Sequence, residues 1–228
     1  IADRVTAVDF SADGTQLLVA GGVPSRSGEL AIFQVADGAR SLHLPQAHDD
    51  VVHSARFSPD ARRIASGGAD KYLRTFDVAA MKPLRRFEGH TNYVLGVAWK
   101  GDGLEIASAG ADAVVKIWDA DTADQKQSIG GFTRHVTAVE YRGATDEVVS
   151  ASGDKQVRVH NAGNGGQVRS MPAVPSWIHG LDVTASGELV AAGSADGTVH
   201  VWNAATGQVM ATIPADPPAA GDAAAARR

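Results

Sequence analysis

The chain has 228 residues, of which 44% are apolar and 21% charged, with 25 glycines and no cysteine. This apolar fraction is enough to form a core, which excludes a disordered chain, and the lack of cysteine excludes disulfides, thiolate metal sites and a thiol nucleophile. The net charge of −5 argues against a general affinity for nucleic acid or for an anionic membrane surface. No apolar run reaches the roughly 18 to 20 residues of a membrane-spanning helix, so we expect no membrane insertion.

A repeat of 42 residues organises most of the sequence. The first copy is the loosest and contains VTAVDF (5–10), LLVAGG (17–22) and LAIFQV (30–35). The next four copies begin, 42 residues apart, with VHSARF (52–57), VLGVAW (94–99), VTAVEY (136–141) and IHGLDV (178–183). They continue in the same register with SGGAD (66–70), SAGAD (108–112), SASGD (150–154) and AGSAD (192–196). A third column follows, with LRTFDV (73–78), VKIWDA (115–120), VRVHNA (157–162) and VHVWNA (199–204). Three columns with one spacing exclude coincidence.

Each copy reads as short β-strands rich in Val, Ile, Phe and Trp, separated by turns such as SADG (11–14) and SPDA (58–61). A weaker fourth strand ends each copy, as in PLRRFEG (83–89) and GQVMATI (207–213). Four antiparallel strands in each ~42 residues predict an all-β propeller. Its five blades are expected at about residues 1–47, 48–89, 90–131, 132–173 and 174–213.

The third copy resembles a complete WD-repeat unit, with GH at 89–90, SAGAD at 108–112 and WD at 118–119. The resemblance to the WD-repeat β-propeller family extends over residues 4–213, although the other copies lack the final Trp-Asp pair. In this family a His, a Ser, an Asp and a Trp form a buried hydrogen-bonded tetrad. The resemblance implies such a structural tetrad in the third blade, made of His90, Ser108, Asp112 and Trp118. In the second blade it implies His48, Ser66 and Asp70, with Phe76 in place of the tryptophan.

Serine, histidine and aspartate are also the residues of a hydrolase triad. We interpret them as structural because a nucleophile site is a single constellation, whereas these residues recur with the repeat. The strand column of Arg74, Lys116, Arg158 and His200 is expected to face solvent, which argues against a histidine metal site. We therefore expect no catalytic, cofactor-binding or metal-binding residues and no enzyme activity.

Binding residues are expected where the copies differ. The column before the first strand reads Arg4, Val51, Tyr93, His135 and Trp177. By the geometry of the family it lies on the top face, near the mouth of the central channel, and aromatic residues and Arg are enriched at binding hot spots. The turns after the tetrad aspartates add Lys71 and Lys155, and the first copy has a longer loop at 21–29. We interpret Arg4, Tyr93, His135, Trp177, Lys71 and Lys155 as top-face binding residues; the alternative is that the aromatic residues only pack turns against neighbouring blades.

The resemblance implies a scaffold that binds a protein or peptide without catalysis. An alternative is a structural or regulatory module of a larger bacterial protein, because PSRSGEL (24–30) and GHTNYVLGVAW (89–99) are similar to WD-repeat segments joined to cytochrome-c-like domains. We expect a soluble protein, and both the cytoplasm and the periplasm stay open as its location.

The ends of the repeat array leave three arrangements open. Each copy contains its own four strands, so no strand is left to join the first blade to the last, and five blades are fewer than the seven usual in the family. The blades could form a strained ring, an open arc cut from a larger propeller, or arcs that self-associate through their open blade edges. We favour the arc and, since the sequence begins at Ile1, expect a piece of a longer protein. Residues 214–228, rich in Pro and Ala, are predicted to be a flexible tail or linker.

Overall fold

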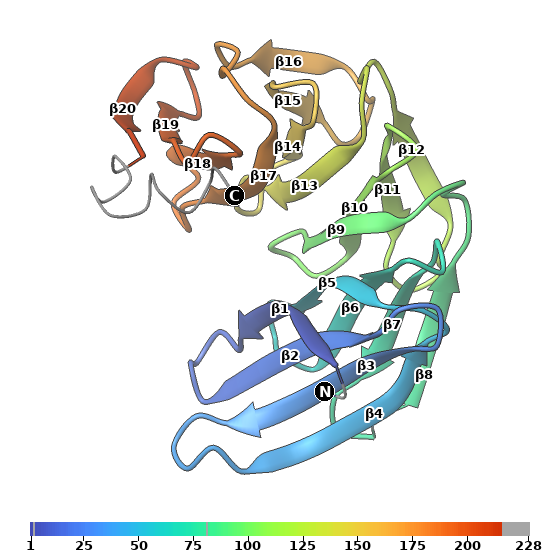
Figure 1. The fold of residues 1–228 in the computed structure, drawn as a ribbon. Coiled ribbons are helices and arrows are strands. Elements are labelled where there is room, and N and C mark those ends of the chain that lie inside the picture. The colour runs from blue at the N-terminus through green and yellow to red at the C-terminus, as the bar shows by residue number, and fades with distance from the viewer. Residues whose placement is uncertain (2, 81, 216–228) are drawn as a thin grey trace, which may run out of the picture.

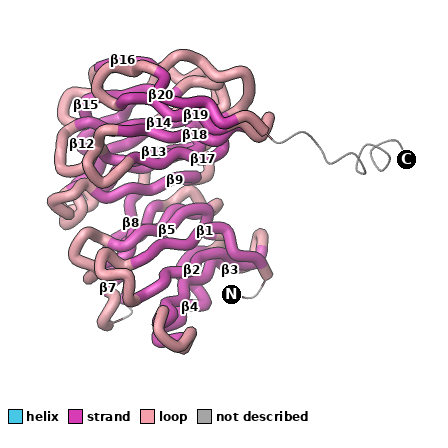
Figure 2. The backbone as a smooth tube through the Cα atoms, turned by 90° about the vertical axis from the view of Figure 1, so that its left-hand side faces the viewer, coloured by secondary structure: helices cyan, strands magenta, loops and turns pink. Residues whose placement is uncertain are grey.

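The structure, a computed structural model, describes residues 1, 3–80 and 82–215. In them, twenty β-strands form five antiparallel sheets of four strands each (Figure 1). The described residues contain no helix, and so none that could cross a membrane (Figure 2). The prediction of an all-β propeller of four-stranded antiparallel blades is confirmed. Residues 216–228 of the predicted tail lie outside the described residues.

Each sheet is one copy of the repeat, and its strands pair in chain order. The first blade consists of β1 (Arg4–Phe10), β2 (Gln16–Val23), β3 (Ser27–Gln34) and β4 (Arg40–His48). The second blade consists of β5 (Val52–Phe57), β6 (Arg63–Gly68), β7 (Leu73–Asp77) and β8 (Lys82–Phe87). The third blade consists of β9 (Val94–Trp99), β10 (Glu105–Gly110), β11 (Val115–Asp119) and β12 (Gln125–Ile129).

The last two blades follow the same order. The fourth consists of β13 (Val136–Tyr141), β14 (Glu147–Ser152), β15 (Val157–Asn161) and β16 (Gln167–Ser170). The fifth consists of β17 (Ile178–Val183), β18 (Leu189–Ser194), β19 (Val199–Asn203) and β20 (Val209–Ile213). Side chains of a strand alternate between the two sides of its sheet, so each blade has two faces.

The core lies between neighbouring blades. We name the face that packs on the preceding blade the N-side face, and the opposite one the C-side face. At the junction of blades two and three, the C-side face contributes Ala65, Leu73 and Phe87. The N-side face of blade three contributes Val94, Val97, Trp99, Ile106 and Trp118. Three further apolar clusters fill the other junctions, so the same interface occurs four times along the arc.

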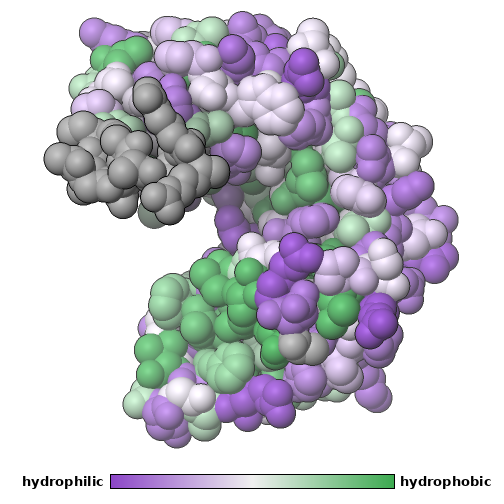
Figure 3. All heavy atoms as spheres, in the orientation of Figure 1, coloured by the Kyte–Doolittle hydropathy of each residue, from purple (hydrophilic) through white to green (hydrophobic). Residues whose placement is uncertain are grey.

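The five blades form an open arc. In Figure 1 the first blade, in blue, and the fifth, in red, stand at the two ends of the arc. Figure 3 shows the opening between them and a patch of hydrophobic residues on the first blade that faces it. On this patch Val5 and Phe10 are exposed. Of the three arrangements that the sequence leaves open, the described residues adopt the arc rather than a closed ring.

Candidate functional site

The third blade joins four polar side chains in one buried group. Nε1 of Trp118 donates to Oγ of Ser108 at 2.8 Å, and Nε2 of His90 lies 2.8 Å from the same oxygen. Nδ1 of His90 lies 2.9 Å from Oδ1 of Asp112. Burial lowers the pKa of His90, against the raising effect of Asp112, so the ring is neutral at pH 7. The network assigns the proton to Nδ1, which donates to Asp112, while Nε2 accepts from the serine hydroxyl.

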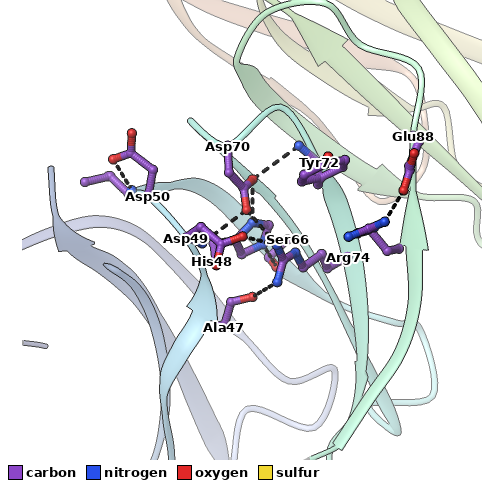
Figure 4. A network of polar contacts seen from close by, with 11 residues as sticks. Ala47, His48, Asp49, Asp50, Ser66, Asp70, Tyr72, Arg74 and Glu88 are labelled. Atoms are coloured by element: carbon purple, nitrogen blue, oxygen red, sulfur yellow. Dashed lines mark hydrogen bonds and ion pairs between the residues drawn. The ribbon is translucent and has the colours of Figure 1, made fainter. Parts of the chain in front are cut away.

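The second blade holds a related group without the indole (Figure 4). His48 contacts Asp70 through Nδ1 at 2.9 Å and Ser66 through Nε2 at 2.7 Å. Phe76 supplies apolar bulk at the tryptophan position but no donor. Arg74 enlarges the group instead, because its guanidinium donates to Asp70 at 2.9 Å and to Asp49 at 2.8 Å.

The expectation that the column of Arg74 faces solvent is wrong. Lys116 and Arg158 are buried and Arg74 is largely covered. Each charge has a partner nearby: Arg74 pairs with Asp70, Arg158 with Asp154 at 2.9 Å, and Nζ of Lys116 donates to Oε1 of Gln125. The long aliphatic stems of these residues cover apolar surface while their heads reach polar groups, which periodicity alone does not reveal.

These groups are not arranged for nucleophilic catalysis. Ser66 and Ser108 are completely buried. The hydroxyl of Ser108 is already engaged by His90 and Trp118, so a substrate carbonyl has no path to it. The described residues also contain no group of three or more His, Asp or Glu side chains that could hold a metal ion.

The fourth blade departs from the tetrad. His160 occupies the tryptophan position, is buried, and its Nδ1 has no hydrogen-bond partner among the described residues. Burial, with a smaller contribution from Arg158, lowers the pKa of His160 to about 4. A histidine that stays neutral in the folded protein but binds a proton in the unfolded chain lowers the free energy of unfolding in acid.

We expect His160→Phe to reduce the loss of stability in acid. Between pH 6.5 and pH 4 the unfolded chain binds a proton at His160 that the folded chain does not, so stability falls as the pH falls through this window. The difference in unfolding free energy between pH 7.5 and pH 5 should therefore be smaller in the variant by about 1–2 kcal/mol. Urea unfolding at both pH values measures this difference, and identical pH dependence in both proteins would contradict the assignment.

The column before the first strands lies where the chain enters β9, β13 and β17. The backbone carbonyls of Tyr93, His135 and Trp177 accept hydrogen bonds from Ala111, Gly153 and Ala195 at 2.8, 3.0 and 2.8 Å. Val51 accepts the equivalent bond but is buried. The backbone is thus held in the same way in four blades while the side chains differ, and those of Tyr93 and Trp177 are exposed.

The structure brings some of the predicted top-face residues together and leaves others apart. His135 packs edge-on against Trp177 with ring centroids 5.3 Å apart, and the guanidinium of Arg134 lies 5.2 Å from the Trp177 ring. Arg4 and Tyr93 line a separate cavity of about 270 Å³. Lys71 and Lys155 are exposed on turns of left-handed backbone, with φ of 72° and 73°, and join neither group.

The segment at 21–29, which the sequence predicts to be a longer loop, consists mostly of strand residues. Its extra residues lengthen β2 and β3 to eight residues each, whereas β6 and β7 have six and five. The backbone amide of Ser25, at the tip of this hairpin, donates to Asp50 at 2.7 Å. The hairpin thereby forms one wall of the 270 Å³ cavity.

Sequence reasoning missed the polar residues of the central channel. A cavity of about 300 Å³ is lined by His53, Arg56, Glu140 and His179, and Arg56 pairs with Glu140 at 3.1 Å. Burial raises the pKa of Glu140 to about 7, against the lowering effect of Arg56. Arg56 and Glu140 stand 84 residues apart in one strand column, so two repeat lengths connect them. A search for charges in the innermost strands would have found this pair.

Known protein families and proteins contain repeats similar to those of this chain. The family described as "WD domain, G-beta repeat" matches residues 39–77, 81–119 and 165–203, which together make up just over half of the chain. A segment of 68 residues, 29% of this chain, is 37% identical to Ribosome assembly protein 4 of Chaetomium thermophilum. It spans only 13% of that protein's length. With its repeats, its four-stranded blades and these matches, the chain belongs to the WD40 repeat family.

Proposed function

We propose that the chain is a non-enzymatic scaffold that binds a protein or peptide on its top face. WD40 propellers commonly serve as protein-interaction scaffolds. The observation that carries the proposal is the pair of exposed aromatic side chains, Tyr93 and Trp177, at equivalent positions of two blades beside the channel. Large aromatic side chains on a rigid backbone lose little conformational entropy on binding, which is why they dominate hot spots.

The surroundings of these side chains suit an extended peptide. The ring centroids of Tyr93 and His53 lie 5.8 Å apart, and His53 lines both the 270 Å³ cavity and the central channel. The cavity is large enough for one or two side chains of a partner. Trp177, stiffened by His135 and Arg134, offers a second contact. A peptide that follows the rim from blade three to blade five would meet both.

We expect the double variant Tyr93→Ala/Trp177→Ala to bind such a partner at least tenfold more weakly. Peptides selected for binding to the wild-type chain from a random library supply the probe, and calorimetry measures the dissociation constants. Because both side chains are exposed, the variant should keep its fold. Leu84→Ala, which removes an apolar side chain as exposed as Trp177 from the outer strand β8, is the matched control and should bind as the wild type does. Undiminished binding by the double variant would refute the top-face proposal.

A second candidate is a structural or regulatory module of a larger bacterial protein that contains a cytochrome-c-like domain. The similarity of residues 24–30 and 89–99 to WD-repeat segments of such proteins favours it. The chain has no cysteine, so haem attachment would require a CxxCH motif elsewhere in the parent reading frame. Sequencing that reading frame tests the candidate, and a frame without CxxCH would exclude it.

A further inference from the structure

The cavity of about 270 Å³ beside Tyr93 lies where three consecutive blades of the chain meet. The first blade contributes Arg4 and the hairpin tip at 24–25 to its walls. The second blade contributes Val51 and Ala69, and the third contributes Tyr93. Blades on both sides of the first junction therefore form this cavity together.

The size of one side chain explains why this junction is hollow. The position before the first strand is occupied in four successive blades by Val51, Tyr93, His135 and Trp177. Trp177 packs on His135, its counterpart in the preceding blade, with ring centroids 5.3 Å apart. Val51 has no ring, and its counterpart in the preceding blade is Arg4; both side chains line the cavity. The second blade thus lacks the ring that the fifth blade supplies for itself.

The walls of the cavity provide contacts that an aromatic ring prefers. Tyr93 adds a ring that is 46% exposed. Arg4 adds a guanidinium, and a guanidinium is attracted to the face of an aromatic ring, as Arg134 is at 5.2 Å from the Trp177 ring. The cavity can therefore offer a ring from outside the same kinds of contact that the chain gives to Trp177.

Asp50 adds one hydrogen-bond acceptor to these walls. Its Oδ1 accepts from the backbone amides of Ser25 and Val51 at 2.7 Å each. Its Oδ2 accepts no hydrogen bond from the part of the chain that the structure describes, which leaves this oxygen to a donor of an occupant. Tyrosine and tryptophan carry a donor on the ring, whereas phenylalanine does not. Because Asp50 and Arg4 have opposite charges, the cavity does not favour a charged occupant.

We propose that this cavity binds the side chain of a tyrosine or tryptophan of the peptide that docks on the top face. The proposal rests on the proposed function and names the residue that the first junction recognises. The ring fills the space between Val51 and Arg4 and contacts Tyr93, and its donor bonds to Oδ2 of Asp50. The longer hairpin of the first blade closes the cavity from the other side through Pro24.

Filling the cavity from within tests the proposal without knowledge of the partner. Val51→Trp gives the second blade the residue that the fifth blade has in Trp177. N-acetyl-L-tyrosinamide is the probe, and two-dimensional NMR of the ¹⁵N-labelled chain measures its binding. In the wild type we expect saturable shifts of the amide signals of Ser25, Val51 and Ala69. Val51→Trp should bind the probe about tenfold more weakly, because its own ring occupies the cavity.

The role of Asp50 has a separate test. N-acetyl-L-phenylalaninamide has the ring but no donor and should bind to the wild type about threefold more weakly than the tyrosine compound. N-acetyl-L-leucinamide, which has no ring, should bind more weakly still. Asp50→Asn keeps an oxygen for the two backbone amides but puts a donor in place of the other oxygen. This variant should therefore lose the preference for tyrosine over phenylalanine.

A matched pair of substitutions covers the case that Val51→Trp does not fold by circular dichroism. Ala69→Leu narrows the cavity from another wall and should weaken binding of the probe. Ala111→Leu is the control, because the amide of Ala111 donates to Tyr93 as that of Ala69 donates to Val51. The control makes the same change one blade further on and should bind the probe as the wild type does.

The outcomes separate this proposal from the proposed function. A probe that does not bind to the wild type, or that binds equally well to Val51→Trp, overturns the proposal, as does equal binding of the leucine compound. Library peptides that lose affinity in Tyr93→Ala/Trp177→Ala but not in Val51→Trp also overturn it and leave the top-face function standing. Binding of the probe as expected, with no library peptide bound, refutes the peptide scaffold and supports the aromatic cavity.

Discussion

Replacing Trp118 with alanine is expected to lower the free energy of unfolding by about 3–5 kcal/mol. The indole is buried at the junction of blades two and three, where its ring lies edge-on to Phe87 at 5.7 Å. Its loss leaves a cavity in that junction and removes the donor that Ser108 accepts from. Urea unfolding at pH 7 measures the change. A loss below about 1 kcal/mol would contradict a structural role for the indole.

Trp118→Phe serves as the matched comparison, because the second blade has Phe76 at this position. Phenylalanine restores most of the apolar volume but no donor, so the expected loss is smaller, about 1–2 kcal/mol. If both variants lose the same free energy of unfolding, the tryptophan stabilises the protein through its hydrogen bond to Ser108 rather than through its packing. If Trp118→Phe is as stable as the wild type, the tryptophan stabilises the protein through its packing.

Replacing Asp70 with alanine is expected to cost about 3 kcal/mol. The carboxylate is buried and accepts from His48, Arg74 and the Tyr72 amide (Figure 4). Its neighbours hold the pKa of Asp70 below its usual value despite the opposing effect of burial, so it is charged at neutral pH. Without it, a buried imidazole loses its acceptor and a largely covered guanidinium loses its closest buried counter-charge.

Asp49→Ala is the control for Asp70→Ala, since Asp49 pairs with the same guanidinium but is 78% exposed. An exposed ion pair contributes at most about 1 kcal/mol, because water solvates both partners well and salt screens them. Urea unfolding of both variants should therefore show a clear difference. Equal losses would mean that burial of Asp70 contributes nothing to the network.

The repeat made much of the fold predictable. Each blade is a local unit of four consecutive strands, and residues at one position of successive blades occupy the same place in the strand pattern. Three columns at a spacing of 42 residues therefore predicted the strand content and the number of blades. The group of His90, Ser108, Asp112 and Trp118 could be named from the sequence because the third copy resembles a complete WD-repeat unit, in which these residue types form a buried tetrad.

The candidate site was less predictable. The column before the first strands was found because it varies between blades, but the packing of His135 on Trp177 depends on how far one blade turns relative to the next. The channel pair of Arg56 and Glu140 joins two blades that are not neighbours in sequence. The burial of Lys116 was mispredicted, because a charged residue in a strand can face either solvent or a covered polar group at the same periodicity.

The sequence by itself determined the strands of each blade, which are four, pair in chain order and turn an apolar side toward each neighbouring blade. These features follow from side-chain alternation and turn residues, which act over a few residues. Only the tertiary structure decided that five blades form an open arc with an exposed face at each end. Each blade is rotated by a small angle relative to the blade before it, and the total over four junctions decides whether the array closes into a ring. The sequence of a single repeat does not reveal that total angle.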